Sequence, residues 1–311
     1  MENNGLNYGQ SALSMPMKSE NIFQDKVTTV SGRNMFGPGG NISKNDALTF
    51  AFNLPAFGKW KSKLESSFGK DFKGISIMDV FPFGPAKTAR GGFVIANASV
   101  SKGGKPVPGF AFIRGGAVAI LPVLENESGA KFVLTLIQPR VPGAEKDYEE
   151  IPAGMLDGGA FGGVAAKEMK EETGLTVKES DLTPLSLMYP SIGGCDENIK
   201  VFLYRAKLSD AAMTELQGKA TGNPDENESI ITKLTPYDEF KQACLTSKIT
   251  DVKAQVALGM YEMMMSSMKD MEGNDWKPVV NAMSGGRRKH TRKAKHTRKT
   301  KHHKKRGTRK H

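Results

Sequence analysis

The residues with the clearest capacity for chemistry are three glutamates, Glu168, Glu171 and Glu172. Their i, i+3, i+4 spacing places all three carboxylates on one face of a helix. Like charges there repel by roughly 0.2–0.5 kcal/mol for each i, i+4 pair, and a divalent cation turns this repulsion into attraction. Hard cations such as Mg²⁺ take oxygen ligands of this kind, usually shared with substrate phosphates. The spacing therefore indicates a Mg²⁺-binding helix, although the glutamates and neighbouring lysines, taken alone, are more typical of a solvated surface helix.

The residues on either side narrow this interpretation. Ile151-Pro152-Ala153-Gly154 precedes the glutamates, and Thr173-Gly174-Leu175 follows them, with Gly174 expected to end the helix. The window resembles the Nudix box, and its Ile-Pro-Ala-Gly start is similar to that of ADP-ribose and ADP-sugar pyrophosphatases. The residues in register are Glu168, Met169, Glu171, Glu172, Gly174 and Leu175. The departures are Lys167 in place of arginine, Gly159 and Ala160 in place of an upstream glutamate, and a shorter stretch from Gly154 to Gly174.

Further segments extend the resemblance to the plant-type ADP-sugar diphosphatase branch of the Nudix family. These are Arg114–Ala119, Ser191–Glu197, Val201–Arg205 and Leu216–Lys219, and the similarity runs from about residue 50 to about residue 268. The resemblance implies an α/β class, with a Nudix α/β/α sandwich built on a mixed sheet. A small antiparallel β domain is expected before it, which in that family helps to build a homodimer.

The resemblance also implies roles for individual residues. It implies Mg²⁺, or Mn²⁺, as cofactor, held by Glu168, Glu172, Glu228 and the main-chain carbonyl of Ala153. Glu171 matches the third glutamate of the box and Glu226 a catalytic base, so these two are the predicted catalytic residues. The predicted substrate-binding residues are Arg114 and Arg140, near the phosphates, and Glu197, near the sugar.

The distribution of histidine limits the chemistry independently of any resemblance. All five histidines lie in residues 287–311, so the rest of the chain has none. A general base there must be a carboxylate, a lysine, a tyrosine or a metal-bound water. Ser-His-Asp and Cys-His catalysis are therefore excluded for the body of the protein.

Charge is divided just as unevenly. Residues 287–311 hold 14 of the 44 Lys/Arg residues and no Asp or Glu, which leaves 30 basic against 33 acidic residues elsewhere, a net charge of −3. Such a tail cannot build a core, and it can bind a polyanion such as nucleic acid or act as a nuclear signal. A merely solubilising tail is the alternative. Its composition is similar to that of basic tails in proteins of large DNA viruses.

Composition shifts divide the chain into four parts. We expect a disordered segment over 1–45, a small β domain over 46–115, the Nudix domain over 116–275 and a disordered basic tail over 276–311. The strands expected are 75–81, 92–100, 109–114, 117–124, 132–137, 182–189, 201–206 and 230–234, with helices within 47–69, near the box, over 210–219 and after 252. On the last helix, Val252, Val256, Met260, Met263 and Met264 are expected to form the buried stripe.

Two further observations concern the compartment. No run of about 18 apolar residues is present, so no membrane span or membrane partner is expected. Cys195 and Cys244 are the only cysteines and lie far apart, which favours a reducing intracellular compartment, cytoplasmic or nuclear.

Together these features predict Mg²⁺-dependent hydrolysis of ADP-sugars, such as ADP-glucose or ADP-ribose, to AMP and a sugar 1-phosphate. The metal would neutralise the pyrophosphate and activate water, and a carboxylate would orient that water. Two alternatives remain open: a Nudix hydrolase of capped RNA or dinucleotides, and a module that binds nucleotide or nucleic acid without turnover.

Overall fold

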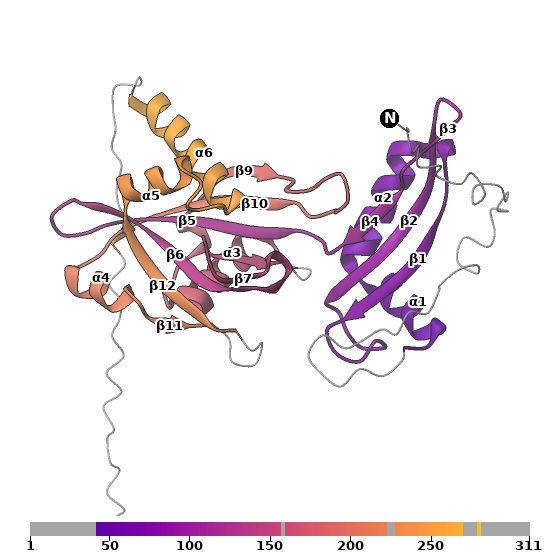
Figure 1. The fold of residues 1–311 in the computed structure, drawn as a ribbon, viewed down its shortest axis with the longest axis horizontal. Coiled ribbons are helices and arrows are strands. Elements are labelled where there is room, and N and C mark those ends of the chain that lie inside the picture. Colours follow the sequence, from indigo (N-terminus) through magenta and orange to yellow (C-terminus); the bar gives the residue numbers. More distant parts are fainter. Residues whose placement is uncertain (1–41, 157–158, 223–227, 270–278, 281–311) are drawn as a thin grey trace, which may run out of the picture.

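The computed structural model of the chain describes residues 42–156, 159–222, 228–269 and 279–280. Figure 1 shows two units side by side, each built on its own sheet and joined by the segment between β4 and β5. The α/β class and the small antiparallel sheet ahead of a larger mixed sheet are confirmed.

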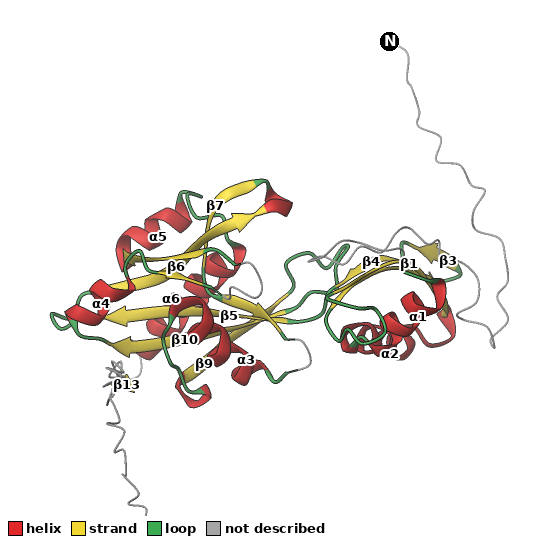
Figure 2. Ribbon diagram, turned by 90° about the horizontal axis from the view of Figure 1, so that it is seen from below, coloured by secondary structure: helices red, strands yellow, loops and turns green. Residues whose placement is uncertain are grey.

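The N-terminal unit packs two helices on a small antiparallel sheet (Figure 2). Its helices begin with clear signals: the Ser43 hydroxyl caps the first by accepting from the Asp46 N–H at 3.1 Å, and Pro55 opens the second. Helix formation thus starts at Lys44, just inside the segment expected to be disordered. The elements are α1 (Lys44–Asn53), α2 (Pro55–Phe68), β1 (Phe72–Pro82), β2 (Gly92–Lys102), β3 (Lys105–Val107) and β4 (Phe110–Ile113).

The larger sheet is mixed. Its central strand β5 pairs antiparallel with β6 and parallel with β10, whose other partners include the antiparallel β9. The strands are β5 (Ala117–Glu125), β6 (Lys131–Arg140), β7 (Glu145–Glu150), β8 (Ala153–Met155), β9 (Leu182–Met188), β10 (Ile199–Lys207), β11 (Ala220–Thr221), β12 (Ile230–Pro236) and β13 (Val279–Val280).

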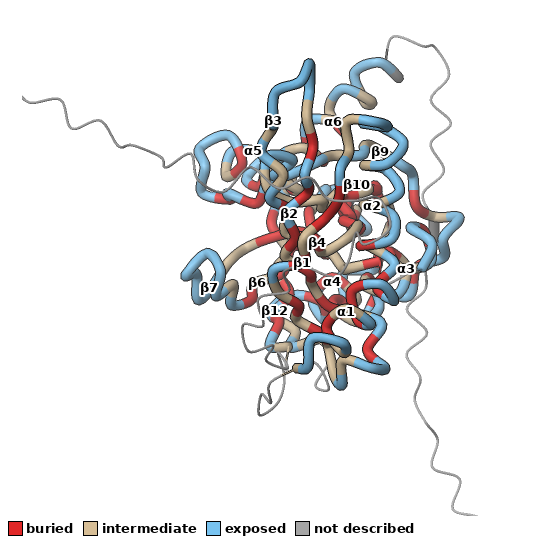
Figure 3. The backbone as a smooth tube through the Cα atoms, turned by 90° about the vertical axis from the view of Figure 1, so that its right-hand side faces the viewer, coloured by how far each residue is buried: buried red, intermediate tan, exposed pale blue. Residues whose placement is uncertain are grey.

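Helices cover both faces of this sheet, as Figure 1 shows. The odd-numbered residues of β5 from Ala117 to Val123 face α5 (Tyr237–Leu245) and α6 (Val252–Lys269), whereas Val118, Ile120 and Leu124 face α3 (Phe161–Glu168) and α4 (Asp210–Leu216). This period of two explains why β5 is a continuous apolar run: a strand covered on both sides buries every side chain. Figure 3 shows buried residues concentrated on the strands and exposed residues at the hairpin tips.

The box helix differs from the expected regular α-helix. Helix α3 ends at Glu168, and residues Met169–Thr173 continue as a wider π turn before Gly174, whose φ of 80° ends the helix as predicted. The Glu171 carbonyl accepts from the Gly222 N–H at 3.4 Å and the Glu172 carbonyl from the Thr221 hydroxyl at 2.5 Å. A π turn holds more residues than an α turn, so the predicted one-face spacing of the three glutamates does not apply.

The prediction for the buried stripe of α6 is confirmed only for Met264, which packs against the core. The residues that are buried there are Ala254, Ala257, Leu258 and Tyr261, while Val252 and Met263 are exposed. Both sets follow helical spacing, so spacing alone does not decide which face of α6 packs against the sheet. None of the helices in the described parts of the chain is long and apolar enough to cross a membrane.

Candidate active site

Strand β8 and the box helix bring two of the predicted residues together with the Ala153-Gly154 segment, and we call Glu168, Glu172 and this segment the carboxylate site. The Ala153 N–H donates to Glu172 Oε2 at 3.0 Å. A Cβ added at Gly154 would lie 2.1 Å from Cδ of Glu168, so only glycine lets this strand approach the Glu168 carboxyl group. Gly154 is thus required by the packing of Glu168, whereas Ala153 acts on Glu172 through its backbone N–H.

Glu172 is buried, with 3% of its surface exposed. Burial raises its pKa well above the ordinary value, and the neighbouring Glu168 carboxylate raises it further, against the lowering effect of the Ala153 N–H. Glu150 and Glu228 also raise the pKa of Glu172. Three carboxylates therefore act on Glu172, which is buried where negative charge is costly.

Glu171 lies apart from this group. Its carboxylate pairs with Lys167 Nζ at 2.9 Å and is about one third exposed. Lys167 is the residue that replaces the family's arginine, and here it neutralises Glu171 at the surface. The prediction that all three glutamates share one face therefore holds only for Glu168 and Glu172, because the π turn redirects Glu171.

The oxygen donors of the carboxylate site are of the kind that bind a hard divalent cation. Across the described ranges, no three Asp, Glu, His or Cys side chains converge closely enough to hold a metal as they stand. The carboxylate and carbonyl oxygens around Glu172 nevertheless match what Mg²⁺ requires. Glu228 lies beside Gly222, where an added Cβ would come within 2.9 Å of Glu228 Cβ. The ends of the 222–228 segment thus meet next to the box helix, while Glu226 itself lies outside the described residues.

The predicted substrate-binding residues are all held in ion pairs. Arg140 donates to Glu150 Oε1 from both Nε and Nη2 at 2.6 Å. Arg114 Nη2 lies 3.3 Å from Glu197 Oε1, and the Arg114 Nε is buried without a hydrogen-bond partner. The structure therefore places Arg140 next to the carboxylate site and joins Arg114 to Glu197 in a separate place.

Three charged residues near the site were not identified from the sequence: Glu150 and Asp251, which are buried, and Lys253, whose side chain is 13% exposed. Lys253 Nζ contacts Glu150 Oε2 at 2.9 Å and Asp251 Oδ1 at 2.7 Å. Glu150 directly precedes Ile151-Pro152-Ala153-Gly154, which was the available signal for it. Asp251 and Lys253 come a hundred residues later, and nothing in their local sequence indicates the contact.

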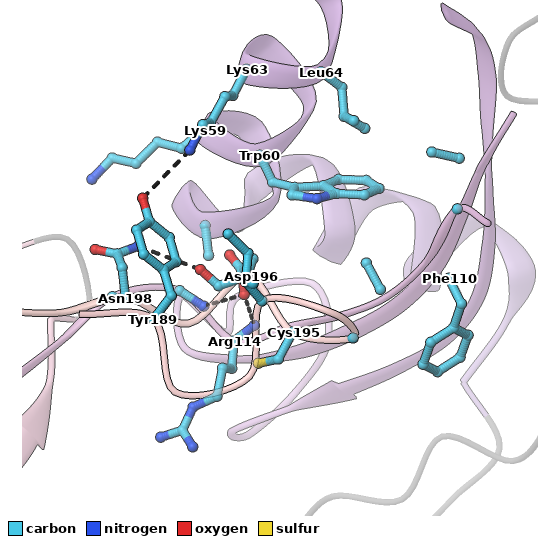
Figure 4. A pocket seen from close by; sticks show the side chains of 18 of the residues that line it. Lys59, Trp60, Lys63, Leu64, Phe110, Arg114, Tyr189, Cys195, Asp196 and Asn198 are labelled. Atoms are coloured by element: carbon cyan, nitrogen blue, oxygen red, sulfur yellow. Dashed lines mark hydrogen bonds between the residues drawn. The ribbon is translucent and has the colours of Figure 1, made fainter. Parts of the chain in front are cut away.

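A pocket of about 500 Å³ lies between α2 and the loop that joins β9 to β10, and we call it the α2 pocket. Trp60, Lys59 and Lys63 enter it from α2, opposite Tyr189 (Figure 4), and Lys63 Nζ lies 3.5 Å from the Tyr189 hydroxyl. Leu156, two residues after Gly154, also lines it. The pocket thus combines aromatic surface with positive charge and reaches the segment that carries the carboxylate site.

The loop wall of this pocket is fixed by Asp196. Its Oδ1 accepts from the backbone N–H groups of Arg114 and Gly115 at 2.8 and 3.0 Å. Burial raises the pKa of Asp196, and these two N–H groups act in the opposite direction. Burial also raises the pKa of the neighbouring Cys195 thiol, which disfavours the reactive thiolate. These contacts make Asp196 and Cys195 structural parts of the wall.

One domain family and two known proteins are similar to this chain. Residues 114–255 match the model of the NUDIX domain. The chain is 38% identical over 241 residues to Nudix hydrolase 14, chloroplastic, of Arabidopsis thaliana, covering 71% of this chain and 74% of that protein. It is also similar to the crystal structure of an ADP compounds hydrolase, with a TM-score of 0.44 and 16% identity over 62% of this chain and 95% of that one. Residues 114–255, which match the NUDIX domain, include the carboxylate site.

Proposed function

The chain belongs to the Nudix hydrolase family, and within it we propose that the protein hydrolyses the pyrophosphate bond of ADP-sugars such as ADP-glucose or ADP-ribose. The products would be AMP and the sugar phosphate. The observation that carries the proposal is the buried Glu172 beside Glu168, with the Ala153 N–H on one of its oxygens. A buried carboxylate beside a second carboxylate suits a site completed by a metal-bound phosphate group.

The cofactor we propose is Mg²⁺, with Mn²⁺ as a substitute. Glu168, Glu172, Glu228 and the Ala153 carbonyl would hold it, since Glu168 and Glu228 both act electrostatically on Glu172. When bound, the metal would offset the phosphate charge and lower the pKa of a coordinated water. Glu150, held by Arg140 and Lys253, is occupied and is not proposed as a ligand.

The base that we propose is Glu226. The body of the protein lacks histidine, so a carboxylate is the natural acceptor for the proton of the attacking water. The described residues Gly222 and Glu228, on either side of this segment, lie at the box helix. Glu171 would support the turn through its ion pair with Lys167, and Arg140 would face the phosphates from its position on Glu150.

The organic part of the substrate would lie in the α2 pocket. The Trp60 ring offers a surface for stacking an adenine or packing a sugar, and Lys59 and Lys63 supply positive charge for an anionic ligand. Figure 4 shows the Arg114 guanidinium turned away from Trp60. The ion pair of Arg114 with Glu197 would therefore support the loop wall on the side away from the ligand. Their predicted contacts with phosphate and sugar then require a side-chain movement.

We also propose that the basic segment 287–311 binds nucleic acid, independently of the hydrolase. Its 14 positive charges against a body of net charge −3 support this second function. A preference for capped RNA as substrate would join the two functions. The N-terminal unit, ending before β5, would be a separate domain that helps to form a homodimer.

A panel of substrates tests the proposal. Purified protein with Mg²⁺ is incubated with ADP-glucose, ADP-ribose, NADH and capped RNA, and the products are separated by ion-exchange chromatography. We expect AMP from the ADP-sugars at the highest kcat/KM. Preferential release of the cap nucleotide would favour the RNA hydrolase instead, and no product from any substrate would favour a binding module.

A further inference from the structure

A network of buried charges lies where α6 begins. Lys253 Nζ sits between Asp251 Oδ1 at 2.7 Å and Glu150 Oε2 at 2.9 Å, and the other Glu150 oxygen accepts from Arg140 at 2.6 Å. Asp251 and Glu150 are almost fully buried. Asp251 also accepts from the Lys253 N–H at 3.1 Å, which fixes it at the start of the helix.

This network holds the backbone that leads into the carboxylate site. The second oxygen of Asp251, Oδ2, accepts from the Ile151 N–H at 3.0 Å, and the Pro152 carbonyl accepts from the Ile120 N–H at 2.9 Å. The next residue, Ala153, donates to Glu172. Residues 150–153 are therefore fixed in succession by α6, by β5 and by the box helix.

We propose that Asp251 and Lys253 are positioning residues for the hydrolytic reaction, which set the Glu150–Ala153 backbone so that Ala153 orients Glu172. The inference rests on the proposed function, since it concerns the site assigned there to the metal. Outer partners that orient a ligand typically change metal affinity or activity about 10–100-fold when they are removed. Neither Asp251 nor Lys253 contacts the carboxylate site directly, so they act through residues 150–153.

A different result is expected if the role of Lys253 is only structural or only electrostatic. Lys253 is a cation close to the site, so a simple charge effect would make Mn²⁺ bind more tightly once Lys253 becomes neutral. Positioning predicts the reverse, because the Ala153 N–H and the Glu172 carboxylate lose their alignment. The sign of the change in metal affinity separates these explanations, and loss of stability alone cannot mimic it in a folded variant.

The decisive variant is Lys253→Met, which keeps the length of the side chain and removes its charge. Binding of Mn²⁺ to the full-length protein is measured by the loss of the free-ion electron paramagnetic resonance signal. We expect the dissociation constant to rise about 10-fold or more. Hydrolysis of ADP-glucose at saturating metal should show a lower kcat with little change in KM, because the substrate pocket is untouched.

Two substitutions at Asp251 make the test more specific. Asp251→Asn keeps an oxygen that can accept from the Ile151 N–H, whereas Asp251→Ala removes it. We expect the alanine variant to lose more Mn²⁺ affinity than the asparagine variant. Equal losses would show that charge, and not the contact with Ile151, carries the effect.

Two controls match these variants. Lys241→Met breaks the exposed pair between Lys241 Nζ and Glu262 Oε2, 3.2 Å apart, and should leave Mn²⁺ affinity unchanged. Leu258→Ala destabilises the same helix from the core side, and its folded form should bind Mn²⁺ like the parent. If folded Lys253→Met binds Mn²⁺ as tightly as the parent, or more tightly, the positioning role is wrong.

The outcome is separable from that of the proposed function. A parent protein that binds Mn²⁺ but leaves ADP-sugars intact would contradict the substrate and leave the positioning test in force. A parent that binds no Mn²⁺ would overturn both. A tenfold weaker Mn²⁺ site in Lys253→Met, with unchanged binding in both controls, supports the inference.

Discussion

The carboxylate site and the α2 pocket are built in opposite ways. Around Glu172, contacts of about 3 Å join buried groups from β8, the box helix and, through residues 150–153, α6. At the rim of the α2 pocket, Ile192 and Phe110 are 73% and 54% exposed, and the Lys63–Tyr189 contact is 3.5 Å long. The carboxylate site is held by buried charges, whereas the rim of the α2 pocket is open to solvent.

This difference indicates that the carboxylate site and the α2 pocket have different tasks in the reaction. Groups that act on a reacting phosphate must be held rigidly, because small displacements weaken electrostatic stabilisation. A surface that binds the remainder of a nucleotide can tolerate movement, since apolar packing is not directional. Substitutions at the carboxylate site should therefore change kcat, and substitutions in the pocket should change KM.

The largest effect is expected for Glu172→Gln, which should abolish turnover by removing a ligand charge at the centre of the carboxylate site. Burial and the nearby carboxylates raise the pKa of Glu172, so a neutral amide should not destabilise the metal-free protein. Steady-state hydrolysis and thermal melting measure the two properties. Glu215→Gln, an exposed change on α4, is the control, and near-parental activity in folded Glu172→Gln would contradict the assignment.

A somewhat smaller effect is expected for Glu226→Gln. Loss of a general base should lower kcat by about 10²-fold or more, and KM should change little. Rates measured from low to high pH should also lose the acidic limb that ionisation of Glu226 would produce in the parent. If the parental rate survives, the base lies elsewhere and the 223–228 segment does not take part in proton transfer.

A modest effect on KM alone is expected in the α2 pocket. Ile192→Glu places a negative charge at its exposed rim without disturbing a core, and should repel an anionic substrate. About 1 kcal/mol of repulsion near a surface corresponds to a rise in KM of roughly fivefold. Leu245→Glu, at a similarly exposed residue of α5, should leave KM unchanged. A change in kcat from Ile192→Glu would contradict the assignment of binding to the α2 pocket and of catalysis to the carboxylate site.

The smallest effect on hydrolysis is expected from deleting residues 285–311. kcat and KM for ADP-sugars should stay nearly the same, while nucleic-acid binding should mostly disappear. In the full chain each neutralised phosphate should contribute about 0.7–0.9 to the slope of log affinity against log salt. Binding should also strengthen below about pH 6.5, where the five tail histidines become protonated. Fluorescence anisotropy with labelled DNA and RNA measures all three, and retained affinity after truncation would exclude the tail.

The sequence predicts the parts of this molecule that local patterns determine. The apolar run of β5, the Ser209 cap of α4 and the Gly174 end of the box helix all follow from short-range rules, and the structure agrees. The i, i+3, i+4 rule singled out the glutamates but assumed an α-helix. The π turn depends on Thr221 and Gly222, which bond to the turn from a distant part of the chain.

The contacts that hold the site in place could not be predicted in this way. Asp251 meets Ile151 across a hundred residues, and Arg140 meets Glu150 across a β-hairpin. The prediction for α6 was only partly right for a related reason, since two faces of this helix are apolar and local spacing cannot decide which one packs against the strands. Spacing indicates which residues can act, whereas tertiary packing decides which of them meet.

The most direct test of the account is a ³¹P NMR spectrum of ADP-glucose incubated with the full-length protein, first with Mg²⁺ and then with EDTA. With Mg²⁺, the paired pyrophosphate resonances should give way to two phosphomonoester resonances of equal area, those of AMP and glucose 1-phosphate. EDTA should stop the change. Intact pyrophosphate resonances in the presence of Mg²⁺, or cleavage that continues in EDTA, would contradict a metal-dependent ADP-sugar hydrolase.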